Sequence, residues 1–227
     1  MAGTIIITGA NSSLGIPAVE HLLSKYPEYN VILTVRNVSD SDVNTKRLRE
    51  TIARHKDAKA DIRQLDLANL SAVHDFADTV VAEVVAGKQP PIASIIGNAY
   101  YWNLTTDAVE TGDGFETTFQ VNYISHVALV LRLLGSFGPE GGRIVLLSSD
   151  AHWPGKNSLE KYTPTIPEDL DSLVKTPPTT EKDKMGKGFQ RYANSKLATV
   201  SWMHALNARL EKVSRFPTLV TLGQNTK

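Results

Sequence analysis

The 227-residue sequence contains no cysteine. This absence excludes disulfide bonds, thiolate zinc sites, iron–sulfur clusters and cysteine nucleophiles, and it is compatible with a reducing compartment. An excess of charge is also absent, because 24 Lys and Arg balance 24 Asp and Glu. A chain without net charge is a poor candidate for binding nucleic acid or an anionic membrane electrostatically. We therefore expect no nucleic-acid partner and no metal centre.

Long apolar runs are absent as well. The longest, residues 127–137, is interrupted by Arg132 and falls well short of the roughly 20 residues that cross a bilayer. The first ten residues have no basic stretch before their short apolar run, which is not typical of a signal peptide. We therefore expect no membrane span and a location in the cytoplasm.

The sequence does contain short β-branched runs that alternate with longer amphipathic stretches. Six runs are typical of buried strands: residues 4–8, 31–35, 60–65, 93–97, 143–147 and 218–222. Helix-length stretches lie between or after them, at 15–26, 44–55, 71–85, within 114–137, and at 192–213. Such alternation predicts βαβ units and a three-layered, doubly wound α/β fold of the Rossmann type with a parallel sheet. We interpret residues 1–227 as a single dinucleotide-binding domain, since this length suits one core.

One segment, residues 152–190, departs from the alternation. It carries five prolines among Lys, Glu, Asp, Ser and Thr. A strand cannot run through such a composition, so we expect a lid-like insertion over the surface. A partly disordered loop and a lid over a ligand site both fit this composition.

A turn rich in Gly and Ser joins the first strand to the first helix, with the sequence Thr-Gly-Ala-Asn-Ser-Ser-Leu-Gly. Such a turn places backbone N–H groups and a helix N-terminus against an anion, usually a dinucleotide pyrophosphate. It lacks the Gly-Lys-Ser/Thr ending of a triphosphatase loop. We predict cofactor contacts from Gly9, Asn11, Ser12, Ser13, Leu14 and Gly15. A purely conformational role for these residues is the alternative.

The ends of the second and third strands carry candidate contacts to the adenosine half of a dinucleotide. Arg36 follows the second strand, where an acidic residue would bind a ribose 2′-hydroxyl and an arginine suits a 2′-phosphate. NADP(H) is therefore predicted over NAD(H), with a solvated arginine as the alternative. Asp66 and Leu67 follow the third strand and are candidates for holding the adenine. Asp66 would serve equally well as a helix cap.

Tyr192 and Lys196 are four residues apart and therefore share one face of a helix. A lysine cation there favours the phenolate, which would lower the tyrosine pKa from about 10 toward working pH. Tyr192 would then exchange a proton with a substrate oxygen. Ser148 and Ser149 follow the fifth strand, at the sheet edge where open α/β folds bind ligands.

Together these residues resemble the short-chain dehydrogenase/reductase family over nearly the whole chain. Its turn pattern is matched by Thr8, Gly9 and Gly15, with Ser13 in place of the middle glycine. Its Asn-Asn-Ala-Gly after the fourth strand is similar to Gly-Asn-Ala-Tyr at residues 97–100. The remaining residues that resemble its site are Asn98, Ala99, Asn122, Ser149, Tyr192 and Lys196.

The resemblance implies a role for each of these residues. Tyr192 would protonate a carbonyl during reduction, and Ser149 would hydrogen-bond the same oxygen. Lys196 would lower the tyrosine pKa and hold the nicotinamide ribose, while Asn122 would organise a water for proton relay. Asn98 and Ala99 are implied cofactor contacts. Structural roles are the alternatives: Ser149 and Asn122 as partners of backbone groups, and Tyr192 as a core residue.

The resemblance also implies a type within the family. Ser149 and Tyr192 are 43 positions apart, a lengthened segment as in retinol dehydrogenases and fungal ketoreductases. This suggests a lid for a bulky, apolar carbonyl or alcohol substrate, with Tyr100, Tyr101, Trp102 and Trp153 as lining or as ordinary core aromatics. Beyond the sixth strand the family continues with a substrate-binding segment and a seventh strand, so we expect that region to be short or missing here.

The favoured function is therefore that of an NADPH-dependent carbonyl reductase or alcohol dehydrogenase. A catalytically impaired dinucleotide-binding protein, with a redox-sensing or scaffold role, is the alternative. A nucleotide-sugar epimerase or dehydratase is a weaker hypothesis, because the chain is short for the extra substrate domain of those enzymes. Association into a homo-oligomer through the long helices is compatible with the resemblance.

Overall fold

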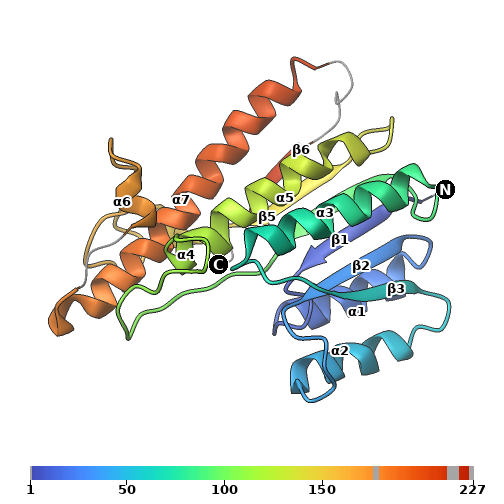
Figure 1. Cartoon of the computed structure of the whole chain (residues 1–227), viewed down its shortest axis with the longest axis horizontal. Helices are drawn as coiled ribbons and strands as arrows, with labels where there is room; N and C mark the ends of the chain where they lie inside the picture. The colour runs from blue at the N-terminus through green and yellow to red at the C-terminus, as the bar shows by residue number, and fades with distance from the viewer. Residues whose placement is uncertain (1, 176–178, 214–219, 225–227) are drawn as a thin grey trace.

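A single sheet of parallel strands forms the centre of the fold (Figure 1). The computed structural model describes residues 2–175, 179–213 and 220–224. Within them one sheet has the order β3-β2-β1-β4-β5-β6, with every neighbouring pair parallel. The strands are β1 (Thr4–Thr8), β2 (Asn30–Val35), β3 (Lys59–Gln64), β4 (Ile92–Gly97), β5 (Arg143–Leu147) and β6 (Val220–Gln224). Strand order reverses beside β1, which creates a crevice at the carboxyl ends of β1 and β4.

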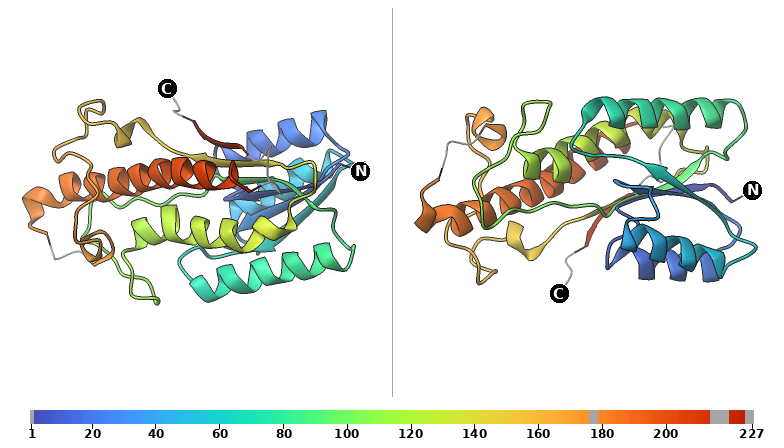
Figure 2. Two further views of the ribbon diagram at one scale, coloured as in Figure 1. Left: turned by 90° about the horizontal axis from the view of Figure 1, so that it is seen from above. Right: turned by 60° about the horizontal axis from the view of Figure 1, so that its bottom comes forward.

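Helices cover both faces of this sheet, as Figure 2 shows. One face packs on α1 (Gly15–Lys25) and α2 (Val43–Ala53), and the other on α3 (Leu70–Val85), α5 (Ser125–Leu133) and α7 (Lys184–Leu210). Successive side chains of a strand point to opposite faces. Ile5 and Ile7 therefore belong to the first core and Ile6 to the second. The predicted three-layered α/β fold is confirmed.

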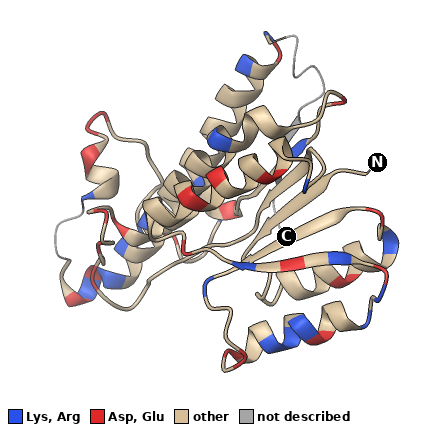
Figure 3. Cartoon of the chain, turned by 45° about the vertical axis from the view of Figure 1, so that its right-hand side comes forward, with Lys and Arg blue, Asp and Glu red and all other residues tan. Residues whose placement is uncertain are grey.

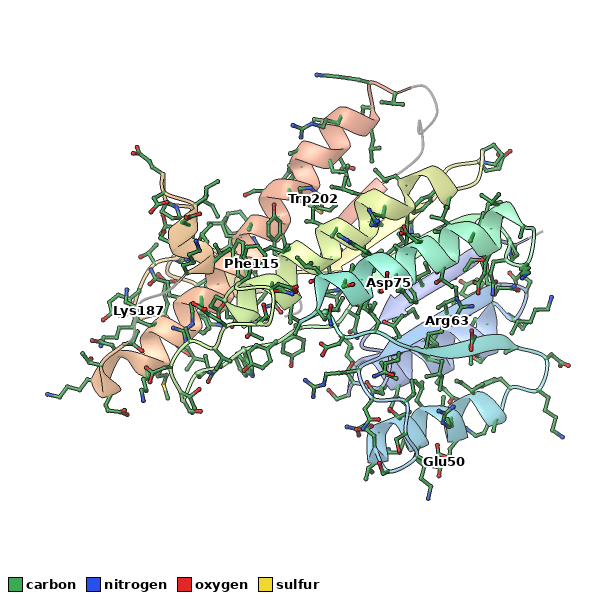
Figure 4. All side chains as sticks on the ribbon, viewed as in Figure 1. Glu50, Arg63, Asp75, Phe115, Lys187 and Trp202 are labelled. Atoms are coloured by element: carbon green, nitrogen blue, oxygen red, sulfur yellow. The ribbon has the colours of Figure 1, made fainter. Side chains whose placement is uncertain are left out.

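The predicted strands agree with the structure except in one respect. β3 was expected to be buried, yet its exposure alternates, and Lys59 and Asp61 are exposed. The physical reason is its position at the edge of the sheet, where β2 is its one partner within the described residues. Arg63 of β3, labelled in Figure 4, donates to Glu83 of α3 at 2.8 Å. For the last strand, residues 218 and 219 of the expected range lie outside the described residues.

The helical stretch expected within 114–137 is divided into several parts. It contains α4 (Thr117–Phe119), a π-helical turn (Gln120–Ile124), α5, and a 3₁₀ turn (Leu134–Ser136). A π turn widens the helix by one residue and is frequent at functional sites. Here it carries Asn122.

Residues 152–190 include several short stretches of regular structure. The segment contains a 3₁₀ turn (Asp150–His152) at its start, α6 (Asp171–Val174), a 3₁₀ turn (Glu181–Asp183) and the first turns of α7. The long helix begins at Lys184, eight residues before its expected start. The expected start was wrong because glycines in this stretch serve packing: a Cβ on Gly186 would lie 2.9 Å from Lys161 Cδ.

The segment is fastened to α7 by its own side chains. Tyr162 donates its hydroxyl hydrogen to Asp183 at 2.6 Å, and Lys161 forms an ion pair with the same carboxylate. The Lys187 ammonium lies 4.1 Å from the centre of the Tyr162 ring. These contacts hold the described part of the segment along the N-terminal half of α7.

The outside of the fold carries both positive and negative side chains. On α2, Glu50 lies among Lys46, Arg47 and Arg49 (Figure 3). The first turns of α7 carry Lys184, Lys187 and Arg191, and the acidic residues Glu181 and Asp183 lie in the 3₁₀ turn just before them. No helix among residues 2–175 and 179–213 is long and apolar enough to cross a membrane.

Candidate active site

The turn after β1 is shaped by glycine and held by one buried amide. Gly9 has φ +61°, and a Cβ there would lie 2.9 Å from the Ala99 Cα. The Asn98 amide nitrogen donates to Thr8 O at 3.0 Å, Gly9 O at 2.9 Å and Ser12 Oγ at 3.1 Å. Asn98 therefore stands behind the turn and fixes its path, which leaves the front of the turn open to a ligand.

A histidine that the sequence analysis missed reinforces the same turn. His126 of α5 lies with Nε2 2.9 Å from Thr8 Oγ1, and that hydroxyl oxygen accepts the Ala99 N–H at 3.0 Å. Burial lowers the pKa of His126 to about 4, and the Lys196 charge acts in the same direction. The ring is therefore neutral at pH 7, and it ties α5 to β1 and to the residues after β4.

A cavity of about 460 Å³ opens in front of the turn, at the carboxyl ends of the first strands. Arg36 stands at its exposed rim. The predicted cofactor residues that line it are Gly9, Asn11, Ser12, Arg36, Asp66, Leu67 and Ala99. The structure thus brings together residues from four loops, those after β1, β2, β3 and β4, that the sequence predicted separately.

The other predicted cofactor residues lie around this cavity. Ser13 lines an adjoining hollow with Asn44 and Arg47, and Leu14 is half exposed. Gly15 is buried where α1 begins, and a Cβ on it would lie 2.6 Å from Ala10 O.

Asp66 is not a helix cap. It accepts the Ala68 N–H at 2.9 Å, whereas α3 is capped by Asn69, whose side chain accepts the Ala72 N–H at 3.0 Å. The capping alternative for Asp66 is therefore wrong, because the helix begins three residues later than that role requires.

Tyr192 lies on α7 beside the cavity, among aromatic rings. Its ring meets Trp102 edge-on at 5.5 Å and Tyr100 at 6.4 Å between centroids. Tyr100 also lines the cavity, so one residue borders both places. The Trp153 ring instead lies 5.0 Å from the His152 ring, centroid to centroid, and Tyr101 lines the cavity. Of the four aromatics expected to line a pocket, two surround Tyr192.

Lys196 is engaged by a strand carbonyl, and the pKa of Tyr192 is raised rather than lowered. Its ammonium donates to Leu147 O at 2.7 Å and lies 5.6 Å from the Tyr192 ring centre. Burial raises the pKa of Tyr192, a hydrogen bond from Ser149 lowers it, and the neighbouring Tyr100 and Asp150 raise it. The expected lowering was wrong because burial dominates and the lysine charge is directed at a strand carbonyl. Burial also lowers the pKa of Lys196 itself, to about 8.

Of the two serines after β5, Ser149 faces Tyr192. Its hydroxyl oxygen accepts the Ala151 N–H at 3.2 Å at the start of the 3₁₀ turn. Ser148 is buried and lies 3.1 Å from His152 Nδ1. The two hydroxyls therefore serve different partners.

Asn122 uses its side-chain amide to join three parts of the site. Its oxygen accepts the Tyr101 N–H at 2.7 Å, and its nitrogen donates to Tyr101 O and Ser195 Oγ, each at 2.9 Å. In this structure the side chain serves backbone groups and a neighbouring helix, which matches the structural alternative stated for it. It positions the π turn against α7, one turn from Tyr192.

A buried ion pair anchors the same stretch of α7. Glu116 is 1% exposed and Arg191 7%, and Arg191 Nε lies 3.6 Å from a Glu116 oxygen. Glu116 also accepts from Thr118 Oγ1 and from the Phe119 N–H, each at 2.8 Å, and so caps α4. Arg191 immediately precedes Tyr192, so the pair fixes where that ring enters the site.

The arrangement places a cleft of about 460 Å³ next to the Tyr192 phenol. A sequence model described as short chain dehydrogenase matches residues 3–165. "Short-chain dehydrogenase iccH" of Talaromyces variabilis is 31% identical, over 92% of this chain and 65% of its own length. Mouse retinol dehydrogenase 14 is also 31% identical, over 92% of this chain and 57% of its own length. The chain thus spans only part of the length of these relatives.

Solved structures give the same picture of the fold. An uncharacterized protein of Mycobacterium Paratuberculosis matches with a TM-score of 0.68 and 30% identity, over 97% of this chain and 66% of its own. NADPH-bound carbonyl reductase from chicken fatty liver matches with a TM-score of 0.68 over 99% of this chain and 79% of its own. At 18% identity that second likeness concerns the fold alone.

Proposed function

We propose that this chain, which belongs to the short-chain dehydrogenase family, uses NADP(H) to interconvert a carbonyl and an alcohol on a small molecule. The observation that carries the proposal is the position of Tyr100. It lines the cavity in front of the glycine turn and lies 6.4 Å from Tyr192, ring centre to ring centre. The cleft suited to a dinucleotide and the phenol suited to proton transfer therefore adjoin.

The residues around the cleft fit a nicotinamide dinucleotide. Gly9 lets the turn pass close to the residues after β4, because a Cβ there would lie 2.9 Å from Ala99 Cα. The turn would hold the pyrophosphate, Asp66 and Leu67 the adenine, and Arg36 a 2′-phosphate. When bound, the nicotinamide supplies or accepts the hydride.

Tyr192 is the proposed general acid. Because its pKa is raised, the phenol keeps its proton at neutral pH and can donate it to a carbonyl oxygen. Ser149 would hydrogen-bond the same oxygen. Lys196, with a pKa of about 8, keeps its charge at pH 7 and would bind the nicotinamide ribose. Asn122 holds the π turn on which the expected water relay depends.

The substrate we propose is apolar and bulky near its reacting group. Trp102 and Tyr100 beside Tyr192 are 45% and 58% exposed, which leaves ring surface for an apolar ligand. We treat residues 1–227 as one dinucleotide-binding unit. Its homo-oligomerisation and its location in the cytoplasm stay predictions.

A dinucleotide-binding protein without catalysis is the second candidate. The observation that favours it is the Lys196 ammonium, which bonds to Leu147 O while burial raises the Tyr192 pKa. Ser13 and Tyr100, where the family has glycine, point the same way. The two candidates differ in one result: hydride transfer to a carbonyl substrate occurs only in the first.

Changing Arg36 to Asp is expected to weaken NADPH binding by about 10- to 100-fold. A charge-assisted hydrogen bond contributes about 1.5–3 kcal/mol, and aspartate would in addition repel the 2′-phosphate. NADH binding should stay equal or improve, since a carboxylate suits a ribose hydroxyl. A fluorescence titration of the full chain with both nucleotides measures the ratio.

The matched control is Lys88→Asp, which makes the same change in net charge on an exposed residue after α3. Its NADPH affinity should equal that of the unaltered chain. Equal NADPH affinity in the Arg36 variant would contradict the assignment of Arg36 to the 2′-phosphate.

A further inference from the structure

Asp150 is hydrogen-bonded to Ser149, the serine beside the proposed acid Tyr192. Ser149 Oγ donates to Asp150 Oδ1 at 3.2 Å. The same carboxylate oxygen accepts from Asn157 Nδ2 at 3.0 Å. Asn157 belongs to the segment between β5 and α7, so that segment holds the carboxylate in place beside Ser149.

The single proton of the Ser149 hydroxyl has two competing acceptors. If Tyr192 were a phenolate, its oxygen would be stabilised by receiving that proton in a hydrogen bond. The Asp150 carboxylate lies within hydrogen-bond distance of the same hydroxyl, at 3.2 Å, and competes with the phenolate oxygen for its proton. Asp150 therefore opposes the phenolate in two ways, through its negative charge and through its claim on the serine proton.

The charged and titratable groups around Tyr192 come from three directions. Tyr100 follows β4, Asp150 follows β5, and Lys196 is on the same helix as Tyr192. Asp150 and Tyr100 both raise the pKa of Tyr192. Lys196 is the one cation of the three, and its ammonium is bonded to Leu147 O.

We propose that Asp150 is a positioning residue that keeps the proton on Tyr192 by engaging Ser149, and so extends to higher pH the range in which Tyr192 can donate that proton to a carbonyl. The inference rests on the proposed function of Tyr192. It also gives part of the long segment a role in the chemistry, because Asn157 secures the carboxylate.

The test compares Asp150→Asn with Asp150→Glu in the full chain. Asparagine keeps a hydrogen-bonding group of the same size but removes the charge, whereas glutamate keeps the charge. Glu50→Gln removes one negative charge from α2, at the opposite end of the molecule from Lys187 in Figure 4, and is the matched control. Tyrosine labelled with ¹³C at Cζ reports the protonation of Tyr192 by NMR, and a Tyr192→Phe sample identifies its signal.

In the free protein, Asp150→Asn should lower the Tyr192 pKa by ~0.5, the size expected for one partly solvated charge. The pH at which kcat/KM for carbonyl reduction begins to fall should decrease by the same amount, since reduction needs the protonated phenol. The pH at which kcat/KM for alcohol oxidation rises should decrease equally, since oxidation needs the phenolate. Glu50→Gln should change none of these, and Asp150→Glu should stay near the unaltered protein.

An unchanged Tyr192 titration in Asp150→Asn would overturn the inference, as would an equal change in Glu50→Gln. The NMR titration needs no turnover, so it separates this inference from the proposed function. If the Tyr192 pKa moves but no carbonyl substrate is turned over, the role of Asp150 in holding the proton stands and the proposed enzymatic function fails.

Discussion

Turnover of a carbonyl substrate is expected to fall by roughly 10²–10⁴-fold in Tyr192→Phe, because the variant lacks the proton donor for the substrate oxygen. Phenylalanine keeps the ring that meets Trp102 and Tyr100, so the fold and the cleft should be retained. NADPH affinity should therefore change little. Steady-state kinetics together with a binding titration measure both quantities on one preparation.

Tyr29→Phe is the control for loss of a tyrosine hydroxyl elsewhere. Tyr29 is half-buried against the core that α1 and α2 cover and does not line the cleft, so its variant should keep full activity. Undiminished turnover in Tyr192→Phe would mean that another group supplies the proton. If the unaltered chain binds NADPH but turns over no carbonyl or alcohol, the catalytically impaired alternative is the correct one.

The largest loss of stability is expected from Glu116→Ala, at about 3–5 kcal/mol in the free energy of unfolding. The variant leaves the Arg191 guanidinium buried without its carboxylate, and it removes the cap of α4. Within the described residues, Arg191 Nε and Nη2 have no hydrogen-bond partner even in the intact protein. Urea denaturation followed by circular dichroism measures the change.

Arg191→Met should cost less, because Glu116 keeps its bonds from Thr118 and Phe119. The double variant Glu116→Gln with Arg191→Met removes both charges and should be more stable than Glu116→Ala, since a buried ion pair is often replaceable by neutral groups. A Glu116→Ala protein within 1 kcal/mol of the unaltered chain, on the order of a surface substitution, would show that water reaches the guanidinium.

Sequence periodicity was sufficient to predict the layers and most element boundaries. Buried strands carry β-branched runs whichever residues surround them, so β1 and β5 were predicted to the residue. β3 was predicted as buried because Ala60, Ile62 and Leu65 give an apolar signal, although its residues alternate between exposed and half-buried for most of its length. Its place at the edge depends on strand order, which periodicity does not contain.

Site residues could be predicted where the residue type itself indicates the ligand group it would bind. They were harder to predict where the role depends on a contact with another residue of the fold. Arg36, Asp66 and the glycine turn converge on one cavity as expected. His126 escaped prediction because a lone histidine in a helix gives no signal until its contact with Thr8 is known. The predicted direction of the Tyr192 pKa shift was wrong for a similar reason. Helix spacing gives the separation of Tyr192 from Lys196 along the chain, but it does not show that the Lys196 ammonium donates to Leu147 O.

The exposed edge at β3 also bears on how the protein behaves at high concentration. An unpaired strand edge is a template on which another chain can add a strand, and charged side chains along it oppose that growth. Lys59 and Asp61 project from this edge, and Arg63 is held by carboxylates on both sides. Two molecules that paired through their β3 edges would have to bury these charges. The charged side chains of β3 therefore oppose edge-to-edge aggregation into fibrils.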